Sequence, residues 1–312
     1  MTYIVIDGGT TNTRINLVTD NAVIDTVKLN QGARSAIDAK ESLASAISRA
    51  ISDILTRNGV KVSAVKRILA SGMITSEFGL YKVDHIVAPA GIPELHSGMK
   101  EVVLHEISPI PFVFVSGVKT APVSLEAADM MRGEETELMG ILNATNEESV
   151  YILPGSHSKI IFTDAKGKIV NFYTMLTGEM LASLSQNTIL KDAVDLYGGN
   201  TDSEYLVKGY EYALANGLNE ALFKTRILKN LFGANTDQTY SFFSGAVLSG
   251  EVKKILSLGA KSIYIAGRSE IKEQLRILIS TDKTVSVIEI DDKTAAQATV
   301  NGILKIYEYT EN

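Results

Sequence analysis

Two short glycine-containing turns, each placed directly after an apolar segment, constrain the fold of this chain more than any other feature. Tyr3–Ile6 is a mostly apolar run that leads into Asp7–Asn12, which reads DGGTTN. Val150–Leu153 leads in the same way into Pro154–Ser158, which reads PGSHS. Because a short apolar run bounded by turn residues is typical of a buried strand, the sequence predicts a strand before each turn.

The segments that follow the two turns occur in a similar order in both halves of the chain. Each half continues with two strands and then with helices and further strands in alternation. Strands are expected at Arg14–Thr19, Ala22–Leu29, Arg67–Ala70, Phe112–Val115, Lys159–Thr163, Ile169–Met175, Ser262–Ala266 and Val285–Ile290. Helices are expected around Leu43–Ile54, from Glu179 to Leu190, within Ser203–Leu256 and around Ala296–Tyr307.

This repeated order predicts an α/β fold built from two similar domains, each with a βββαβα arrangement. We expect the first domain to span residues 1–130 and the second to span residues 131–312, with a cleft between them. The halves share little residue identity, so the repeat is one of architecture.

Length and composition limit the classes of function. A chain of 312 residues is longer than one ordinary core supports, which agrees with two domains. The net charge of −6 argues against a nucleic-acid or anionic-membrane partner. The absence of cysteine excludes disulfides, thiolate catalysis and cysteine-ligated zinc. With no apolar run near the roughly 18 residues of a membrane span, and no signal peptide, we expect a cytoplasmic protein with a small-molecule substrate; a homodimer is an open alternative to a monomer.

The chemistry of the two turns points to phosphate. Successive backbone amides in a glycine-containing turn form an anion-binding concavity, and Thr10–Thr13 add neutral donors. Asp7, at the end of a strand, suits a magnesium site. Two such turns facing one cleft would hold the β- and γ-phosphates of ATP. The alternative is that each is an ordinary turn between strands. The chain contains no Walker A sequence, and no G-x-G-x-x-G follows its first strand.

Five stretches resemble the 2-dehydro-3-deoxygalactonokinase family of the sugar-kinase/actin/Hsp70 superfamily of ATPases. They are Asp7–Arg14, Ser71–Ile74, Met131–Thr136, Leu153–Lys159 and, more weakly, Thr177–Glu179. The resemblance implies two actin-like, ribonuclease H-like domains, the first on the substrate side and the second on the nucleotide side. It also implies phosphorylation of 2-dehydro-3-deoxy-D-galactonate at the C6 hydroxyl by in-line transfer from ATP with Mg²⁺.

The sequence departs from this family at two places. Gly8 stands where the family usually has a tryptophan. Thr75–Leu80 reads TSEFGL, where the family usually has a run that contains a basic residue. Because Glu77 lies in that run, a kinase of the same superfamily that acts on another sugar or sugar acid is an alternative.

A kinase that acts on a hydroxyl needs a carboxylate to accept the proton. Related sugar kinases carry this acid at the start of the helix that leads into the second strand repeat, which favours Glu134, with Asp129 as the second candidate. The alternative is that Glu134, Glu135 and Glu137 only favour a helix N-terminus through its dipole.

The resemblance assigns further residues to the sugar acid and to the nucleotide. Substrate binding is expected from Ser71, Gly72 and Met73, from Arg132 through the carboxylate, and from Glu179 through sugar hydroxyls. The alternatives are a structural ion pair for Arg132 and an ordinary helix start at Glu179. ATP binding is expected from Gly8, Gly9, Thr10, Thr11, Asn12, Gly155, Ser156, His157, Ser158, Lys159 and Gly267, with Asp7 for Mg²⁺.

A different class of function is a non-enzymatic ATP-binding protein, such as a filament or a sugar-sensing regulator. Such a regulator is expected to carry a DNA-binding segment ahead of the first strand, where this sequence has only Met1 and Thr2. We therefore favour the kinase.

Overall fold

The computed structural model describes residues 1–33, 35–142, 147–267 and 270–311, which form two compact units. Unit 1 contains residues 1–148, 163–171 and 293–312, and unit 2 contains residues 149–162 and 172–292. Each unit is described by itself. Within the described part of the chain, no helix combines the length and apolar character that a membrane span requires.

Unit 1 is built on a six-stranded sheet with the order β3-β2-β1-β4-β7-β6. The central strand β1 is antiparallel to β2 and parallel to β4, and β4 is parallel to β7. The strands are β1 (Thr2–Gly8), β2 (Thr13–Thr19), β3 (Ala22–Leu29), β4 (Val65–Gly72), β6 (Lys100–Val102) and β7 (Phe112–Phe114). The strands expected from the sequence in this half are therefore confirmed, and β6 is an edge strand that the sequence did not reveal.

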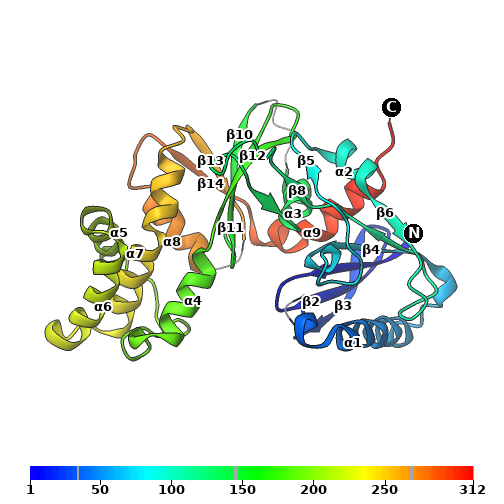
Figure 1. Ribbon diagram of the computed structural model, residues 1–312, viewed down its shortest axis with the longest axis horizontal. Helices are drawn as coiled ribbons and strands as arrows, with labels where there is room; N and C mark the ends of the chain where they lie inside the picture. The colour runs from blue at the N-terminus through cyan, green and yellow to red at the C-terminus, as the bar shows by residue number, and fades with distance from the viewer. Residues whose placement is uncertain (34, 143–146, 268–269, 312) are drawn as a thin grey trace. The chain divides into compact units, whose positions relative to one another are not determined.

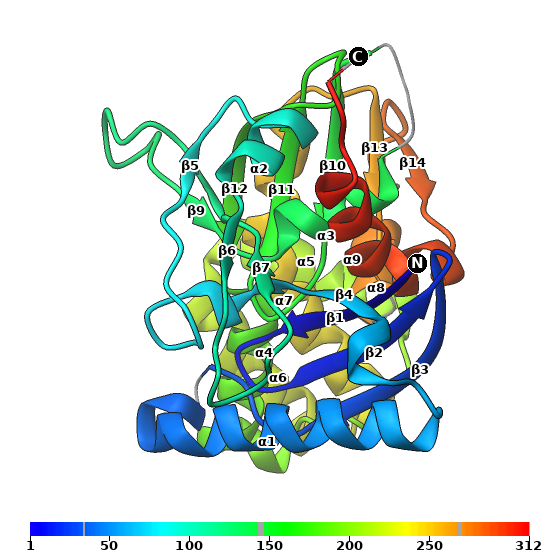
Figure 2. The ribbon, with the colours of Figure 1, turned by 90° about the vertical axis from the view of Figure 1, so that its right-hand side faces the viewer.

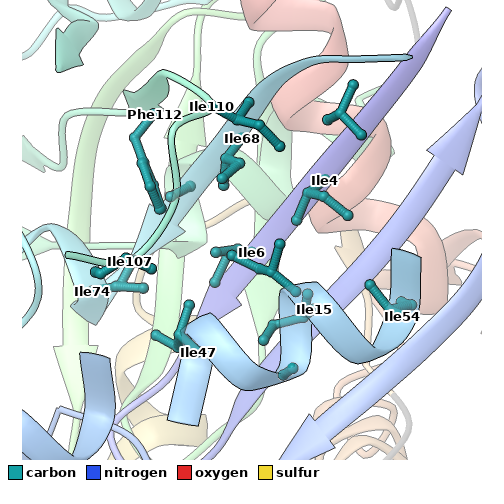
Figure 3. Close-up of a cluster of buried hydrophobic side chains, with 14 of the residues drawn as sticks. Ile4, Ile6, Ile15, Ile47, Ile54, Ile68, Ile74, Ile107, Ile110 and Phe112 are labelled. Atoms are coloured by element: carbon teal, nitrogen blue, oxygen red, sulfur yellow. The ribbon is translucent and has the colours of Figure 1, made fainter. Parts of the chain in front are cut away.

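Helix α1 (Ser35–Arg57) covers one face of this sheet (Figure 2). Ile47 and Ile54 of α1 project toward Ile6 and Ile15 of the sheet in the core shown in Figure 3. All four side chains are fully buried, so the apolar spacing that predicted this helix also fixes the face that it buries.

A second, three-stranded sheet of unit 1 has the order β5-β8-β9. Its strands are only two residues long: β5 (Ile86–Val87), β8 (Val118–Lys119) and β9 (Met130–Met131). Strands this short carry no readable alternation, so this small sheet could not be predicted from the sequence. Unit 1 also contains the short helices η1 (Val62–Ala64), η2 (Met73–Thr75), α2 (Ile92–Gly98) and α3 (Glu134–Ile141).

The expected domain boundary at residue 130 is wrong, because α3 and the C-terminal helix belong to unit 1. Helix α9 (Asp292–Tyr307) crosses α3 with backbone against backbone. A Cβ at Gly140 would overlap the Ala298 carbonyl, and a Cβ at Gly302 would overlap the Thr136 carbonyl. Lys305 also donates to the Met139 carbonyl at 3.1 Å. This close crossing returns the end of the chain to unit 1.

Unit 2 is built on a five-stranded sheet with the order β12-β11-β10-β13-β14, which repeats the order β3-β2-β1-β4-β7 of unit 1. The strands are β10 (Ser149–Leu153), β11 (Ser158–Thr163), β12 (Ile169–Met175), β13 (Ser262–Ile265) and β14 (Ser286–Glu289). The helices are α4 (Thr177–Asn187), η3 (Ile189–Asp192), α5 (Ser203–Asn216), α6 (Leu218–Phe232), α7 (Thr236–Leu256) and α8 (Glu270–Ile279).

The helical region expected at Ser203–Leu256 divides into three helices that pack on one another (Figure 1). The breaks fall at Gly217 (φ +87°) and Gly233 (φ +67°), in a backbone region that favours glycine. Asn235 then caps α7 by accepting from the Gln238 amide at 3.0 Å.

The α3–α9 crossing predicts that Gly140→Ala destabilises unit 1. The added methyl group has no space against the α9 backbone, and overpacking of this kind costs about 1–3 kcal/mol. Gly250→Ala is the matched control, because Gly250 is an exposed α7 residue with nothing near its Cβ position, and the change should stabilise its helix by about 0.8–1 kcal/mol. Urea unfolding followed by circular dichroism measures both. Equal effects of the two variants would contradict the close crossing.

Candidate functional site

The first glycine turn joins β1 to β2 and leaves backbone amides without an acceptor. The Gly9 amide donates to the Asn12 carbonyl at 2.8 Å and closes the turn. Within the described residues, the amides of Thr10 and Thr11 have no acceptor. Because free successive amides favour an anion, this turn suits phosphate oxygens, in line with the expectation for residues 8–12.

Gly32, which follows β3, lies directly on this turn. A Cβ at Gly32 would lie 2.5 Å from the Gly9 carbonyl oxygen and 2.6 Å from that of Thr10. The next amide, of Ala33, donates to the Gly9 carbonyl at 3.1 Å, and the Thr13 hydroxyl donates to the Gln31 carbonyl at 2.8 Å. The turn is therefore held from one side by the backbone of residues 31–33. No sequence motif marks Gly32.

The Ser71–Met73 loop lies beside the first turn, as expected. The β1–β4 register pairs Asp7 with Ser71 and Gly8 with Gly72. Gly72 has φ +84°, and a Cβ there would lie 2.5 Å from the Gly8 carbonyl oxygen. The Ser71 hydroxyl is buried and has no hydrogen-bond partner within the described part of the chain.

Position 8 has no room for a side chain. A Cβ at Gly8 would lie 2.6 Å from the Cβ of Ile74, which is buried in the core. In this chain Ile74 therefore occupies the space that a side chain at position 8 would need.

Three carboxylates gather where β1 ends and α3 begins. Burial raises the pKa of Asp7, the Arg14 guanidinium that donates to it at 3.1 Å opposes this rise, and the charge of Glu134 adds to it. Burial and the charges of Asp7 and Glu134 raise the pKa of Glu137 to about 7. Since Glu134 and Glu137 lie three residues apart, they share one face of α3. Sequence reasoning treated Glu137 only as a residue that favours a helix N-terminus.

Glu135 closes the turn before α3. Both its carboxylate oxygens accept from the Gly133 amide, at 2.9 and 2.8 Å. Burial raises its pKa to about 8. Gly133 has φ +116°, and the Arg132 amide donates to the Glu134 carboxylate at 3.1 Å. The backbone before α3 is thus fixed, and Glu134 is held at the first turn.

Arg132 uses its guanidinium to hold a loop. Its Nη1 donates to the carbonyl and hydroxyl of Thr75 at 2.8 and 2.6 Å. Its Nη2 donates to the Val83 carbonyl at 2.9 Å and to His85 Nδ1 at 3.2 Å. The expected binding of the substrate carboxylate by Arg132 stays a prediction. These hydrogen bonds do not support it, because both Nη groups already donate to protein atoms.

Asp129 lies next to β9 in the small sheet. Its amide donates to the Thr120 hydroxyl at 2.7 Å, and its carboxylate accepts from the Met130 amide at 2.7 Å. These local bonds are typical of a turn-forming aspartate. Of the two candidate bases, the described contacts therefore favour Glu134.

The second glycine turn, in unit 2, repeats the construction of the first. A Cβ at Gly178, in the first turn of α4, would lie 2.5 Å from the Gly155 carbonyl oxygen. The Glu179 amide donates to the Ser156 carbonyl at 3.1 Å. Gly155 itself has nothing within 4 Å of its Cβ position, so packing within the described chain does not require a glycine there.

The side chains expected around the second turn lie close together. His157 Nε2 and the Glu179 carboxylate are 2.9 Å apart. The buried Lys159 ammonium donates to the His157 carbonyl at 3.0 Å. Gly267, after β13, has φ +105°, and a Cβ there would lie 3.6 Å from Pro154 Cδ. The contact between His157 and Glu179 was not expected from the sequence, where His157 was predicted to bind ATP and Glu179 to bind sugar hydroxyls.

A buried carboxyl group on α7, Glu251, anchors this turn and was missed by the sequence analysis. The Thr177 hydroxyl donates to its Oε2, and Ser158 is a second hydrogen-bond partner. Within the described residues its Oε1 has no partner, and burial raises its pKa to about 7. Ser158 Oγ in turn lies 3.4 Å from the Gly155 amide. No motif marks Glu251, which lies inside a long helical stretch.

Asp7 is the residue that fits a magnesium ion. Within the described residues, no group of three or more acids and histidines has a geometry that would hold a metal ion. Magnesium is usually bound by one or two carboxylates together with water and substrate phosphates. A largely buried carboxylate next to free turn amides matches that pattern, so Mg²⁺ at Asp7 would depend on the nucleotide.

Comparisons with known proteins bear on the family and the fold of this chain. A family model described as 2-keto-3-deoxy-galactonokinase matches residues 7–306. A curated relative from Rhizobium meliloti (strain 1021), named "Probable 2-dehydro-3-deoxygalactonokinase DgoK1", is 27% identical over 197 residues, 62% of this chain and 59% of the relative. The match therefore spans less than two thirds of that relative's length.

Two solved structures show the same fold. A Sinorhizobium meliloti protein named for 2-dehydro-3-deoxygalactonokinase superposes with a TM-score of 0.78 at 21% identity, over 97% of each chain. The activator of 2-hydroxyisocaproyl-CoA dehydratase from Clostridium difficile, solved with bound ADPNP, gives a TM-score of 0.52 at 11% identity, over 99% of this chain and 95% of that one. The α/β fold expected from the sequence is thus confirmed.

Glu251 predicts a pH dependence of stability. Its raised pKa means that the folded state binds the proton more tightly than the unfolded state, whose pKa is near 4.5. The stabilisation is complete below about pH 4.5 and is lost as pH rises through about 7. Between about pH 5 and pH 8 the wild type should therefore lose roughly 3 kcal/mol relative to Glu251→Gln, which cannot ionise. Urea unfolding at both pH values measures this difference, and parallel changes in the two proteins would contradict it.

Proposed function

The chain belongs to the 2-keto-3-deoxy-galactonokinase family, and we propose that it transfers the γ-phosphoryl group of ATP to the C6 hydroxyl of 2-dehydro-3-deoxy-D-galactonate. The observation that carries the proposal is the group of carboxylates at the start of α3, next to a turn with free amides. A hydroxyl nucleophile requires an acid–base group and a phosphate site in one place, and unit 1 offers both.

The two glycine turns bind the phosphates in this proposal. In unit 1 the amides of Thr10 and Thr11 donate to phosphate oxygens. In unit 2 the Gly155–Ser158 turn does so, while His157 and Lys159 add positive charge or donors for the transferring group. Another protein of this fold was solved with ADPNP, which supports nucleotide binding by the architecture. When bound, Mg²⁺ neutralises charge on the phosphates, and Asp7 would hold it.

Glu134 is the general base in this proposal. As the C6 oxygen bonds to the γ-phosphorus, the bond from that phosphorus to the bridging oxygen breaks and ADP leaves. The hydroxyl proton passes to the Glu134 carboxylate, which the Arg132 amide holds at 3.1 Å. Asp7 and Glu137 are the other carboxylates of the group to which Glu134 belongs.

We place this reaction in the cytoplasm, with a soluble sugar acid as the partner and neither nucleic acid nor membrane involved. The support is the net charge of −6 and the absence of cysteine. The homodimer that the sequence left open stays a prediction.

The substrate is tested by ADP release from the purified protein with ATP and Mg²⁺. We expect strong stimulation by 2-dehydro-3-deoxy-D-galactonate and weak stimulation by its gluconate epimer and by aldoses. If only another sugar acid stimulates ADP release, the proposed substrate is wrong, and Thr75–Leu80, where Glu77 pairs with Lys82, becomes the candidate for the changed specificity. If no compound stimulates ADP release, the proposed kinase activity is wrong.

The roles of Glu134 and Asp7 are tested by substitution. Glu134→Gln and Asp7→Asn should each lower kcat at least about a hundredfold, because one removes the proton acceptor and the other the magnesium ligand. Glu101→Gln, at an exposed acid of unit 1 that pairs with Arg67, is the control and should keep normal turnover. Near-normal activity of Glu134→Gln would show that Glu134 is not the general base. Asp129 would then be the candidate, and the turnover of Asp129→Asn would test it.

A further inference from the structure

One face of the small sheet in unit 1 carries a histidine and a lysine that no motif assigns to a function. A Cβ at Gly117, directly before β8, would lie 2.6 Å from His85 Cδ2. The imidazole therefore covers the side-chain position of residue 117. Because side chains alternate along a strand, we infer that Lys119 lies on the same face as that position, which agrees with the effect of its charge on His85.

The protonation state of His85 follows from its contact with Arg132. A guanidinium only donates, so the His85 Nδ1 that lies 3.2 Å from Arg132 Nη2 must accept. Burial and the charges of Arg132 and Lys119 lower the pKa of His85 to about 4. The ring is thus neutral near pH 7, and its proton is on Nε2.

Two hydrogen-bond donors of this face lack an acceptor. Neither His85 Nε2 nor Lys119 Nζ has a hydrogen-bond acceptor or a salt-bridge partner in the described ranges of the chain, and Asp84 acts on His85 only through its charge. Both side chains are half-buried. A lysine at a structural position usually has a carboxylate or carbonyl partner, as Lys168 has Glu94 and Lys272 has Asp292. The unpaired donors of His85 and Lys119 are suited to an anion that comes from outside the protein.

We propose that His85 and Lys119 bind the carboxylate of the sugar acid and so select acids over neutral sugars. The inference deepens the proposed function and rests on it. Arg132, the residue first expected to bind this carboxylate, already has its Nη donors on Thr75, Val83 and His85. Arg132 therefore orients the His85 ring through its hydrogen bond to Nδ1.

The position of this pair relative to the base supports the same assignment. Arg132 contacts His85 through its side chain and Glu134 through its amide. A sugar acid has its carboxylate at C1 and the reacting hydroxyl at C6, the two ends of the chain. Binding of one end at His85 and Lys119 leaves the other end free for Glu134. Asp84 is the exposed acid near this face, and a bound carboxylate would have to avoid it.

The test compares three lysine variants by kinetics and by direct binding. Lys119→Met should raise KM for 2-dehydro-3-deoxy-D-galactonate by roughly 10- to 100-fold, with KM for ATP unchanged, because a charge-assisted bond to the carboxylate is lost. Lys119→Arg, which keeps the charge, should recover most of the affinity. Lys100→Met removes an exposed lysine of the edge strand β6 and should leave KM unchanged.

Calorimetric titration of the full chain with the acid, in the absence of ATP, separates this inference from the proposed function. Binding of the acid that is weakened by Lys119→Met supports the inference, even without turnover, in which case only the proposed reaction fails. Turnover of the acid with unchanged KM in Lys119→Met would overturn the inference and leave the reaction intact. An unmodified protein that neither binds nor phosphorylates the acid would overturn both.

Discussion

In each unit of this protein, the backbone of a glycine presses on the carbonyl of a turn glycine, and the rest of the site depends on that contact. Gly32 lies against Gly9, and Gly178 lies against Gly155, and in both cases a Cβ would come within 2.5 Å of the turn carbonyl oxygen. The contact uses carbonyl groups, so in the first turn the amides of Thr10 and Thr11 are left for a ligand. The same arrangement in two halves with little residue identity shows that backbone geometry, rather than side-chain identity, has been retained in the repeat.

The carboxylates of the candidate site repel one another and so destabilise the folded state. Such a cluster is typical of a functional site. Asp7, Glu134 and Glu137 are gathered at the start of α3 with Arg14 as the positive group next to them. Like charges at short range in a partly buried position raise one another's pKa and weaken the fold. The negative charge would attract a divalent cation, and one of the carboxylates could accept a proton in catalysis. Glu135 and Glu251 are different, because each is buried and bonded to the backbone or hydroxyls of a turn.

Much of the fold was readable from the sequence, whereas several contacts that build the site were not. The strands from Tyr3 to Leu29 and from Val150 to Met175 were readable because they are apolar or alternating and end in turn residues. The two-residue strands of the small sheet show no periodicity. The boundary at residue 130 failed because α9 packs on α3 across a long sequence separation. The contacts of Arg132 could not be predicted because its partners, Thr75 and Val83, lie in a loop about fifty residues away. Glu251 could not be predicted because a buried acid inside a helix has no local signature.

The central claim, that a hydroxyl at the end of a sugar acid receives the γ-phosphoryl group, is tested most directly by the structure of the product. Phosphorus–proton correlation NMR of the product formed from ATP and 2-dehydro-3-deoxy-D-galactonate reads the position of the phosphate. The account predicts coupling of phosphorus to the two C6 protons. Coupling to a proton on another carbon, or the absence of any phosphorylated sugar acid, would contradict it.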